Sequence, residues 1–522
     1  MPVTRELLAR LRTLDDLLEF VAALGYAPCA DELNAEAQRR LGLTAPGLGI
    51  RRAAILSRAG TLAVYGLVAD HPVRGPVAVA VERLARTTAG GQHLLLALDS
   101  AATTLACAVA PADHGSAPAR QLRIPLRNPS PVALEILSGL AVRPGDGALR
   151  HAARIAETLA EEGLTSRFFR EFRRLHAHAA EQLGAMPRAT ATERHDLALV
   201  ILTRVLFLYF VQAKGWLAGR GDFLPSALDT ALGRGHPFHR RVFEPLCFGA
   251  LSTPRHARQL AARALGDLPF LNGGLFERHR LERRFPDAAL PNDAWRELFD
   301  GLFERFHFTA REDGDGDAVD PEMLGRVFEG LMGETERRTS GTYFTPRSLV
   351  RELVERALAA AGVGDDQHAL ESIRILDPAV GSGAFLLEAL HQLERARGPL
   401  RAGESTAARR RAIVRDNLFG VDADPMAVRL AELRLWLAMV VDDDATPADV
   451  APLPNLDWNV RQGDSLLSPL DGAGWAASSQ QARVRSVAER KTRFYVSSGR
   501  DKAALARAIR GDERVLALAA VD

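Results

Sequence analysis

A strand, a glycine-bearing loop and a helix follow one another between residues 372 and 397, and this succession constrains the fold more than any other feature. Ser372–Leu376 is a short apolar run that is typical of a buried strand, and it ends at Asp377. The next residues carry Gly381 and Gly383, and Ala384–Arg397 has the apolar spacing of a helix. A doubly wound α/β sheet opens in this way and binds its ligand at the carboxyl ends of its strands, so we expect such a sheet here.

Two further strands are predicted downstream, and each ends in a carboxylate. Leu418–Val421 leads to Asp422, and Val460–Asp464 carries Asp464 at its carboxyl end. An acidic residue at the end of the second strand accepts hydrogen bonds from ribose hydroxyls in nucleotide-binding sheets. The third glycine of the dinucleotide fingerprint is replaced by Leu386, so no pyrophosphate cradle is predicted. The pattern favours a ribose-bearing ligand without phosphate, whereas the glycine loop by itself also fits an ordinary α/β turn.

Composition excludes several classes of protein. A net charge of +1 over 522 residues predicts no global attraction to nucleic acid, so any basic footprint must be local. Lysine occurs only at Lys214, Lys491 and Lys502, and none of these lies in a Gly-Lys-Ser/Thr loop, which argues against an NTPase motor. The three cysteines, Cys29, Cys107 and Cys247, are far apart, which indicates a reducing, cytoplasmic location and no metal site.

The chain divides into four predicted parts. Residues 1–140 form a small α/β domain with strands in Thr61–Val68 and His93–Ala110, and Pro125–Val132 is predicted as a linker. Residues 147–320 are mostly helical, 321–467 carry the glycine-loop sheet, and 468–522 are helical again. The most apolar stretch, Leu197–Val211, is interrupted by Arg204 and is too short to span a bilayer, so we expect a buried helix and no membrane partner.

Two charged patterns leave alternatives open. Arg167, Arg170 and Arg174 share one face of a predicted helix, which suits either contacts with DNA phosphates or an ordinary solvated face. Asp313, Asp315 and Asp317 alternate as in a calcium loop, but the glycine and glutamate that such a loop needs are absent, which favours an acidic turn.

Four motifs occur in one order, and together they resemble a known family. They are Gly-Thr-Tyr-Phe-Thr-Pro at 341–346, Asp-Pro-Ala-Val-Gly-Ser-Gly-Ala-Phe-Leu at 377–386, Gly-Val-Asp-Ala-Asp-Pro at 420–425 and Gly-Asp-Ser-Leu at 463–466. The order is similar to that of γ-class N6-adenine DNA methyltransferases, in the large type IIG/IIL restriction-modification form that also occurs in phage-defence systems of the BREX kind. The Leu-Asn-Gly-Gly-Leu-Phe turn within 269–277 resembles the same proteins.

The resemblance implies a Rossmann-like core that binds S-adenosyl-L-methionine. By resemblance, Thr345 and Pro346 would contact the methionine part of this cofactor, and Asp377, Gly381 and Gly383 would shape its pocket. Asp422 would hold the ribose, and Asp464 would accept the adenine amino group. The implied substrate is double-stranded DNA, from which such enzymes flip the target adenine.

The family's catalytic tetrapeptide, Asn-Pro-Pro-Tyr, does not occur in the sequence, so we assign no catalytic residue. We therefore expect an incomplete sheet with an exposed apolar edge, and a cofactor-binding half that needs a second polypeptide for catalysis and target recognition. Two alternatives stay open: a truncated form of one longer enzyme, and a non-catalytic scaffold or DNA-binding subunit of a defence complex. Residues 1–140 lack the lysine of an Asp…Glu-x-Lys nuclease, so a degenerate nuclease-like domain or a plain recognition domain is expected there.

Overall fold

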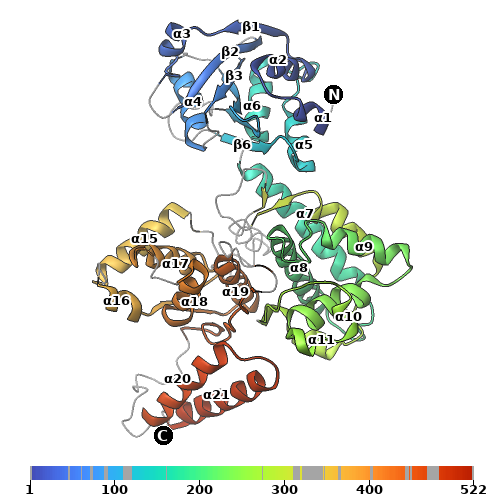
Figure 1. Cartoon of the computed structure of the whole chain (residues 1–522), viewed down its shortest axis with the longest axis vertical. Helices are drawn as coiled ribbons and strands as arrows, with labels where there is room; N and C mark the ends of the chain where they lie inside the picture. Colours follow the sequence, from blue (N-terminus) through green and yellow to red (C-terminus); the bar gives the residue numbers. More distant parts are fainter. Residues whose placement is uncertain are drawn as a thin grey trace. The chain divides into compact units, whose positions relative to one another are not determined.

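A computed structural model of the chain describes residues 3–44, 48–59, 62–70, 74–87, 92–109, 120–159, 161–272, 274–309, 318–319, 345, 347–362, 366–399, 404–440, 446, 449–466 and 481–519. Contacts divide the chain into two compact units. Unit 1 comprises residues 1–172, 299–308 and 313–319, and unit 2 comprises 173–298, 309–312 and 320–522. Each unit contains a sheet with helices packed on it, so the predicted mixture of α and β structure is confirmed (Figure 1).

The sheet of unit 1 has six strands that lie side by side in sequence order. Neighbouring strands are antiparallel except β3 and β4, which are parallel and are joined by helix α4 (Arg74–Thr87). The strand structure predicted within 61–68 and 93–110 is confirmed as β3 and as the antiparallel pair β4 and β5. The strands are β1 (Pro28–Glu32), β2 (Ile50–Ala59), β3 (Leu62–Ala69), β4 (Gln92–Asp99), β5 (Thr104–Val109) and β6 (Arg120–Pro125).

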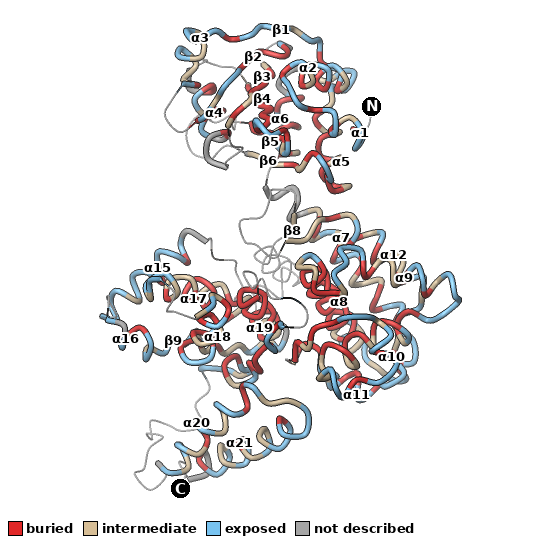
Figure 2. The backbone as a smooth tube through the Cα atoms, viewed as in Figure 1, coloured by how far each residue is buried: buried red, intermediate tan, exposed pale blue. Residues whose placement is uncertain are grey.

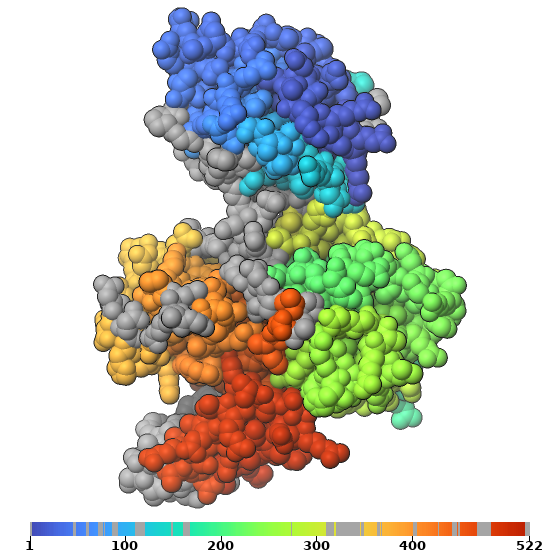
Figure 3. All heavy atoms as spheres, viewed as in Figure 1, coloured from blue at the N-terminus to red at the C-terminus, as the bar shows by residue number. Residues whose placement is uncertain are grey.

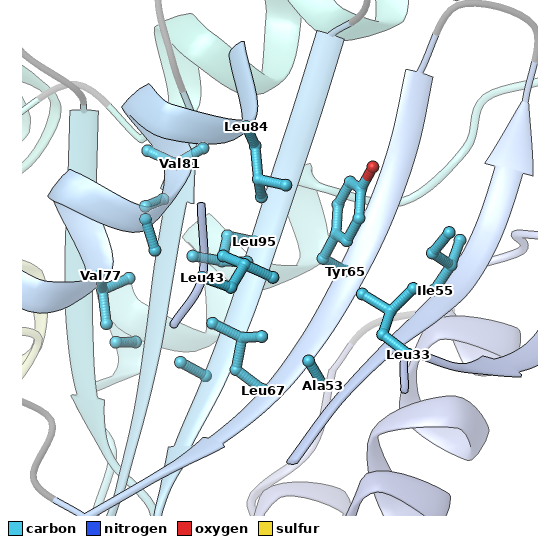
Figure 4. Packing of buried hydrophobic residues seen from close by; sticks show 14 of the residues in the cluster. Leu33, Leu43, Ala53, Ile55, Tyr65, Leu67, Val77, Val81, Leu84 and Leu95 are labelled. Atoms are coloured by element: carbon cyan, nitrogen blue, oxygen red, sulfur yellow. The ribbon is translucent and has the colours of Figure 1, made fainter. Parts of the chain in front are cut away.

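One hydrophobic core cluster of unit 1 lies between α4 and the sheet. Val77, Val81 and Leu84 of α4 pack against Leu67 and Leu95 of the strands beneath (Figure 4). Further helices are α1 (Arg5–Ala9), α2 (Leu14–Ala23), α3 (Ala35–Arg40), α5 (Pro131–Gly139) and α6 (Ala148–Thr158), and a two-stranded pair is formed by β7 (His307–Phe308) and β8 (Ala318–Val319).

The predicted linker at 125–132 lies inside unit 1 instead. It joins β6 to α5, and its side chains are anchored: Leu126 is buried, and the buried Ser130 accepts a hydrogen bond from the Ala133 amide at the start of α5. Proline, asparagine and serine favour helix starts as well as linkers, so composition did not separate the two.

Unit 2 begins within helix α7 (Glu161–Gln182), which runs from one unit into the other, and its helical part is built around α8 (Ala191–Ala213). Thr190 and Glu193 form a capping box at the start of α8, and most of the helix is buried, as predicted. Although α8 is apolar and long enough to cross a membrane, 83% of its most apolar window is buried inside the fold, as in a core helix. Arg204 is fully buried on it, paired with Glu282.

Unit 2 also contains several short elements. They are α9 (Phe223–Gly233), α10 (Leu260–Arg263), α11 (Arg280–Arg284), α12 (Asn292–Leu298), π-helical turns at His239–Phe243 and Pro245–Leu251, and 3₁₀ turns at Arg255–Ala257 and Gly274–Phe276. A further π-helical turn, Phe299–Phe303, belongs to unit 1.

The second sheet of the molecule contains three parallel strands in the order β11-β10-β9. Helices α17 and α19, which follow β9 and β10, pack against the sheet, and Figure 2 shows their buried residues. Leu376 of β9 is 61% exposed, so the sheet leaves an apolar side chain uncovered. The elements are β9 (Ile375–Asp377), β10 (Leu418–Asp422), β11 (Val460–Gln462), α15 (Arg347–Ala360), α16 (Gln367–Ser372), α17 (Ala384–Ala396), α18 (Thr406–Asn417) and α19 (Pro425–Val440).

A helical hairpin, α20 (Gln481–Tyr495) and α21 (Gly499–Ala519), follows the sheet. Its small core contains Phe494, Ile509 and Leu516. The side-chain amide of Asn455 donates to the carbonyl oxygens of Phe494 (2.7 Å) and Ser497 (2.6 Å), which fastens the hairpin to the segment before β11.

Candidate functional site

The carboxyl ends of β9 and β10 are joined by the glycine loop that follows β9. In the parallel register Gly420 lies opposite Asp377, so Asp377 and Asp422 end neighbouring strands at the same edge. The Val380 amide donates to the Val421 carbonyl (2.9 Å), and the Gly381 amide donates to Oδ2 of Asp422 (2.8 Å). Two predicted site residues, Gly381 and Asp422, are therefore in direct contact.

Asp422 connects three segments at this edge. Besides the bond from Gly381, its Oδ1 accepts from the Asp424 amide (2.9 Å), and its carbonyl oxygen accepts from the Gly463 amide after β11 (2.9 Å). A carboxylate has about four acceptor positions, so each oxygen can still accept one further hydrogen bond. The geometry thus keeps Asp422 fixed and leaves it able to bind a diol.

Asp377 retains an unused acceptor. Its Oδ1 accepts from the Ala379 amide (3.1 Å), whereas Oδ2 is buried and has no hydrogen-bond partner among the described residues. Burial raises the pKa of Asp377, and the nearby Asp422 carboxylate raises it further, although the Ala379 bond opposes both effects. A buried acceptor without a partner is costly in free energy, so a ligand that donates to Oδ2 would relieve that cost.

The two loop glycines have different physical roles. Both have positive φ (50° at Gly381 and 82° at Gly383), which residues with a side chain rarely adopt. A Cβ on Gly383 would lie 3.2 Å from the Cα and Cβ of Ala431, so this glycine lets the start of α17 approach α19. A Cβ on Gly381 would have no neighbour closer than 4.0 Å, so space remains above this residue at the strand ends.

Three residues support the loop although they were not predicted as site residues. A Cβ on Gly420 would come within 2.8 Å of Val380 Cγ2, and an isolated strand glycine is a recognised signal of such an approach. Ser465 Oγ donates to the Pro378 carbonyl (2.7 Å), and Arg434 donates to the Ser382 carbonyl (2.8 Å). Nothing local in the sequence marks Arg434, because its partner lies 52 residues earlier.

The other predicted cofactor residues are placed less fully. Asp464 is exposed, and its Oδ1 accepts from the Leu466 amide (2.9 Å) in a local turn. Thr345 is half-buried shortly before α15, and Pro346 lies outside the described residues. Asp313, Asp315 and Asp317 of the predicted acidic turn also lie outside them, and the described part of the chain holds no cluster of His, Cys, Asp and Glu that could bind a metal.

The predicted arginine stripe of α7 is largely neutralised by acidic neighbours. Arg167 pairs with Glu135 (3.6 Å), and Arg174 pairs with Glu297 (2.8 Å). Arg170 is exposed and makes no ion pair with another described residue. Binding of DNA by this stripe stays a prediction, and of its three arginines only Arg170 lacks an acidic partner among the described residues.

Comparison with known proteins places the strand-end site in a recognised family segment. Residues 319–470 match the N-6 DNA methylase family, which confirms the predicted resemblance of this segment to N6-adenine DNA methyltransferases. Residues outside it are not covered by that match.

Curated relatives share part of this chain. A putative type II restriction enzyme and methyltransferase of Methanocaldococcus jannaschii is 27% identical over 55% of the chain and 29% of its own length. The adenine-specific methyltransferase PglX of Streptomyces coelicolor is 28% identical over 32% of the chain and 15% of its own length. The chain thus spans less than a third of either relative.

Among solved structures, the type IIL restriction-modification enzyme MmeI in complex with DNA is similar at 17% identity and a TM-score of 0.38, over 58% of this chain and 40% of that one.

Proposed function

We propose that the chain carries the S-adenosyl-L-methionine-binding half of a Rossmann-like, site-specific adenine-N6 DNA methyltransferase of a restriction-modification or phage-defence system. The single observation that carries the proposal is the pair of strand-end aspartates: Asp422, held by the Gly381 amide, and Asp377, with one buried oxygen unused. The family match at 319–470 supports it independently.

The residues present fit this cofactor in kind. Asp422 keeps one acceptor position on each carboxylate oxygen for the two ribose hydroxyls. Asp377 offers a buried acceptor to a donor on the ligand, and Gly381 leaves room for close approach. In the same proposal Thr345 and Pro346 contact the methionine part, Gly383 shapes the loop and Asp464 accepts the adenine amino group. Bound there, the cofactor would supply an electrophilic methyl group.

Catalysis on DNA requires groups that these 522 residues do not contain. The family's Asn-Pro-Pro-Tyr tetrapeptide is absent from the sequence. We propose that it, and the target-recognition domain, are supplied by polypeptide outside these residues, either continuous with this chain or in a separate partner. The alternative, a non-catalytic cofactor-binding scaffold, is favoured by the same absence. Methyl transfer to adenine after addition of a polypeptide with the tetrapeptide separates the two.

Calorimetry tests the cofactor site. The wild-type chain is expected to bind S-adenosyl-L-methionine, and Asp422→Ala is expected to bind it at least about tenfold more weakly, because a hydrogen bond to a charged group contributes about 1.5–3 kcal/mol. Thermal unfolding of both proteins controls for damage to the fold. Equal dissociation constants would contradict the proposal.

A further inference from the structure

Helix α21 presents two opposite faces. Lys502, Ile509 and Leu516 are buried and recur every seven residues, so they form a row that faces the rest of the fold. Arg500, Arg507 and Arg514 recur at the same interval and are exposed. At about 100° per residue the two rows lie on opposite sides of the helix, and Arg510 lies beside the exposed row. We call Arg500, Arg507, Arg510 and Arg514 the arginine face.

Two acidic residues of α21, Asp512 and Glu513, form ion pairs away from this face. Asp512 accepts ion pairs from Arg483 and Arg490 of α20. Glu513 pairs with Lys491 (2.8 Å) and Arg461 (3.2 Å), so both acids serve other parts of the fold. The four arginines of the arginine face make no ion pair with another described residue. In a chain with a net charge of +1, this is a local concentration of uncompensated charge.

The residues between the arginines have small, exposed side chains or none. Ala503, Ala504 and Gly511 are exposed on this side of α21, and Val515 at its edge is 41% exposed. The hot spots of protein interfaces are enriched in Trp and Tyr as well as Arg, and the arginine face carries no aromatic side chain. Small residues between cations instead let a phosphate backbone approach the helix closely. Figure 3 shows the atoms of the hairpin in red.

We propose that the arginine face of α21 binds the sugar-phosphate backbone of duplex DNA. From Arg500 to Arg514 the helix rises about 21 Å, at ~1.5 Å per residue. The phosphates of one strand follow at ~3.4 Å along the duplex axis, so this length spans about six base pairs. Because each strand also winds around that axis, a straight helix meets only some of these phosphates. The arginines of the row are about 10 Å apart, so each can reach a different phosphate. The inference rests on the proposed function for its choice of DNA as the partner.

Salt-dependent binding tests the assignment. The full chain is compared with the variant R500Q/R507Q/R514Q, since glutamine and arginine have similar helix propensities. The matched control is R167Q/R170Q/R174Q on α7, which changes the net charge equally. Fluorescence anisotropy with a labelled duplex of about 30 base pairs gives the slope of log affinity against log salt, which falls by about one for each phosphate that the protein no longer neutralises.

The α21 variant should lower that slope by about three and the affinity on the order of 100-fold at about 0.1 M salt. The α7 control should lower the slope by about one, because only Arg170 is uncommitted. An unchanged slope in the α21 variant would overturn the proposal, as would wild-type binding to polyglutamate but not to duplex. Should the triple variant misfold, R507Q alone should still lower the slope by about one, and no change would count against the proposal.

Cofactor titration of the same proteins keeps the two proposals separate. The α21 variant should bind S-adenosyl-L-methionine with wild-type affinity. If the wild type binds the cofactor and the α21 variant binds duplex as tightly as the wild type, this inference fails and the cofactor site stands. If Asp422→Ala leaves cofactor binding intact while the α21 variant no longer binds duplex DNA, the proposed cofactor site fails and this inference stands.

Discussion

A parallel strand in each unit ends in an aspartate, and the two aspartates differ in what they contact. Asp99 ends β4 in unit 1, is buried, and accepts from the amides of Thr103 (2.6 Å) and Thr104 (3.1 Å) and from the Thr103 hydroxyl. All of these donors lie within its own turn. Asp422 ends β10 in unit 2, and it accepts from Gly381, which follows a different strand.

The difference lies in how the acceptors are used. The carboxylate of Asp99 closes the β4–β5 turn, and the hydrogen bonds described for it all come from residues of that turn. Asp422 joins three segments, and beside it Asp377 keeps a buried oxygen without a partner among the described residues. A strand-end carboxylate therefore indicates a binding site when its acceptors face other strands or remain unused. By this criterion we expect the sheet of unit 2 to bind a ligand and the Asp99 turn to stabilise the fold.

The largest expected effect comes from matched glycines in the two sheets. A Cβ on Gly420 would lie 2.8 Å from Val380, and a Cβ on Gly66 would lie 2.8 Å from Leu56. Gly420→Val and Gly66→Val should each destabilise its sheet by about 1–3 kcal/mol or more, as overpacking does. Only Gly420→Val should also abolish binding of S-adenosyl-L-methionine, because Val380 belongs to the glycine loop. Thermal unfolding and calorimetry measure the two effects.

Loss of cofactor binding in Gly66→Val, with the sheet of unit 2 still folded, would contradict this prediction. Binding of the cofactor by Gly420→Val with wild-type affinity would contradict it equally.

A smaller effect is expected from the aspartates themselves. Asp422→Asn should weaken cofactor binding about tenfold, through loss of charge-assisted hydrogen bonds. Asp99→Asn should cost about 1–3 kcal/mol of unfolding free energy, because three donors in its turn lose a charged acceptor, and should leave the affinity unchanged. Chemical denaturation and calorimetry of both variants give these values. A loss of affinity in Asp99→Asn similar to that in Asp422→Asn would remove the distinction between the two strand ends.

The smallest effect concerns Asp377 and depends on pH. Because the folded state raises the pKa of this carboxyl, folding favours its protonated form, and stability falls as pH rises from the ordinary aspartate pKa through the folded value. Asp377→Asn removes that cost, so its Tm at pH 7 should exceed that of the wild type by at most a few degrees. This gain in Tm should shrink as the pH falls toward about 3.9. The Asp377→Asn variant should also bind the cofactor more weakly than the wild type does. A gain in Tm that is independent of pH would contradict this account.

Several elements of the site could be predicted from the sequence, because β9 and β10 are short, largely apolar runs that end at aspartate. The observed bounds of α17, β10 and β11 lie within two residues of those expected. The sequence did not predict the role of Gly420 or Arg434, because these depend on side chains brought close only by the folded sheet.

Charged faces were the least predictable feature. The spacing of Arg167, Arg170 and Arg174 was visible in the sequence, but the acids that pair with two of them lie up to 123 residues away. The arginine face of α21 could not be distinguished from an ordinary solvated helix until Asp512 and Glu513 were seen to pair elsewhere. Local spacing gives the row of charges, whereas only tertiary contacts show which charges are left over.

Hydrogen exchange with and without S-adenosyl-L-methionine tests the central claim, that the strand ends of unit 2 form the cofactor site. Backbone amides in 377–386 and 418–424 should exchange more slowly in the presence of the cofactor, the Gly381 amide among them. Amides in 62–69 and 92–99 of unit 1 should exchange at the same rate in both conditions. Protection confined to the unit 1 strands, or none at either sheet at saturating cofactor, would contradict the account.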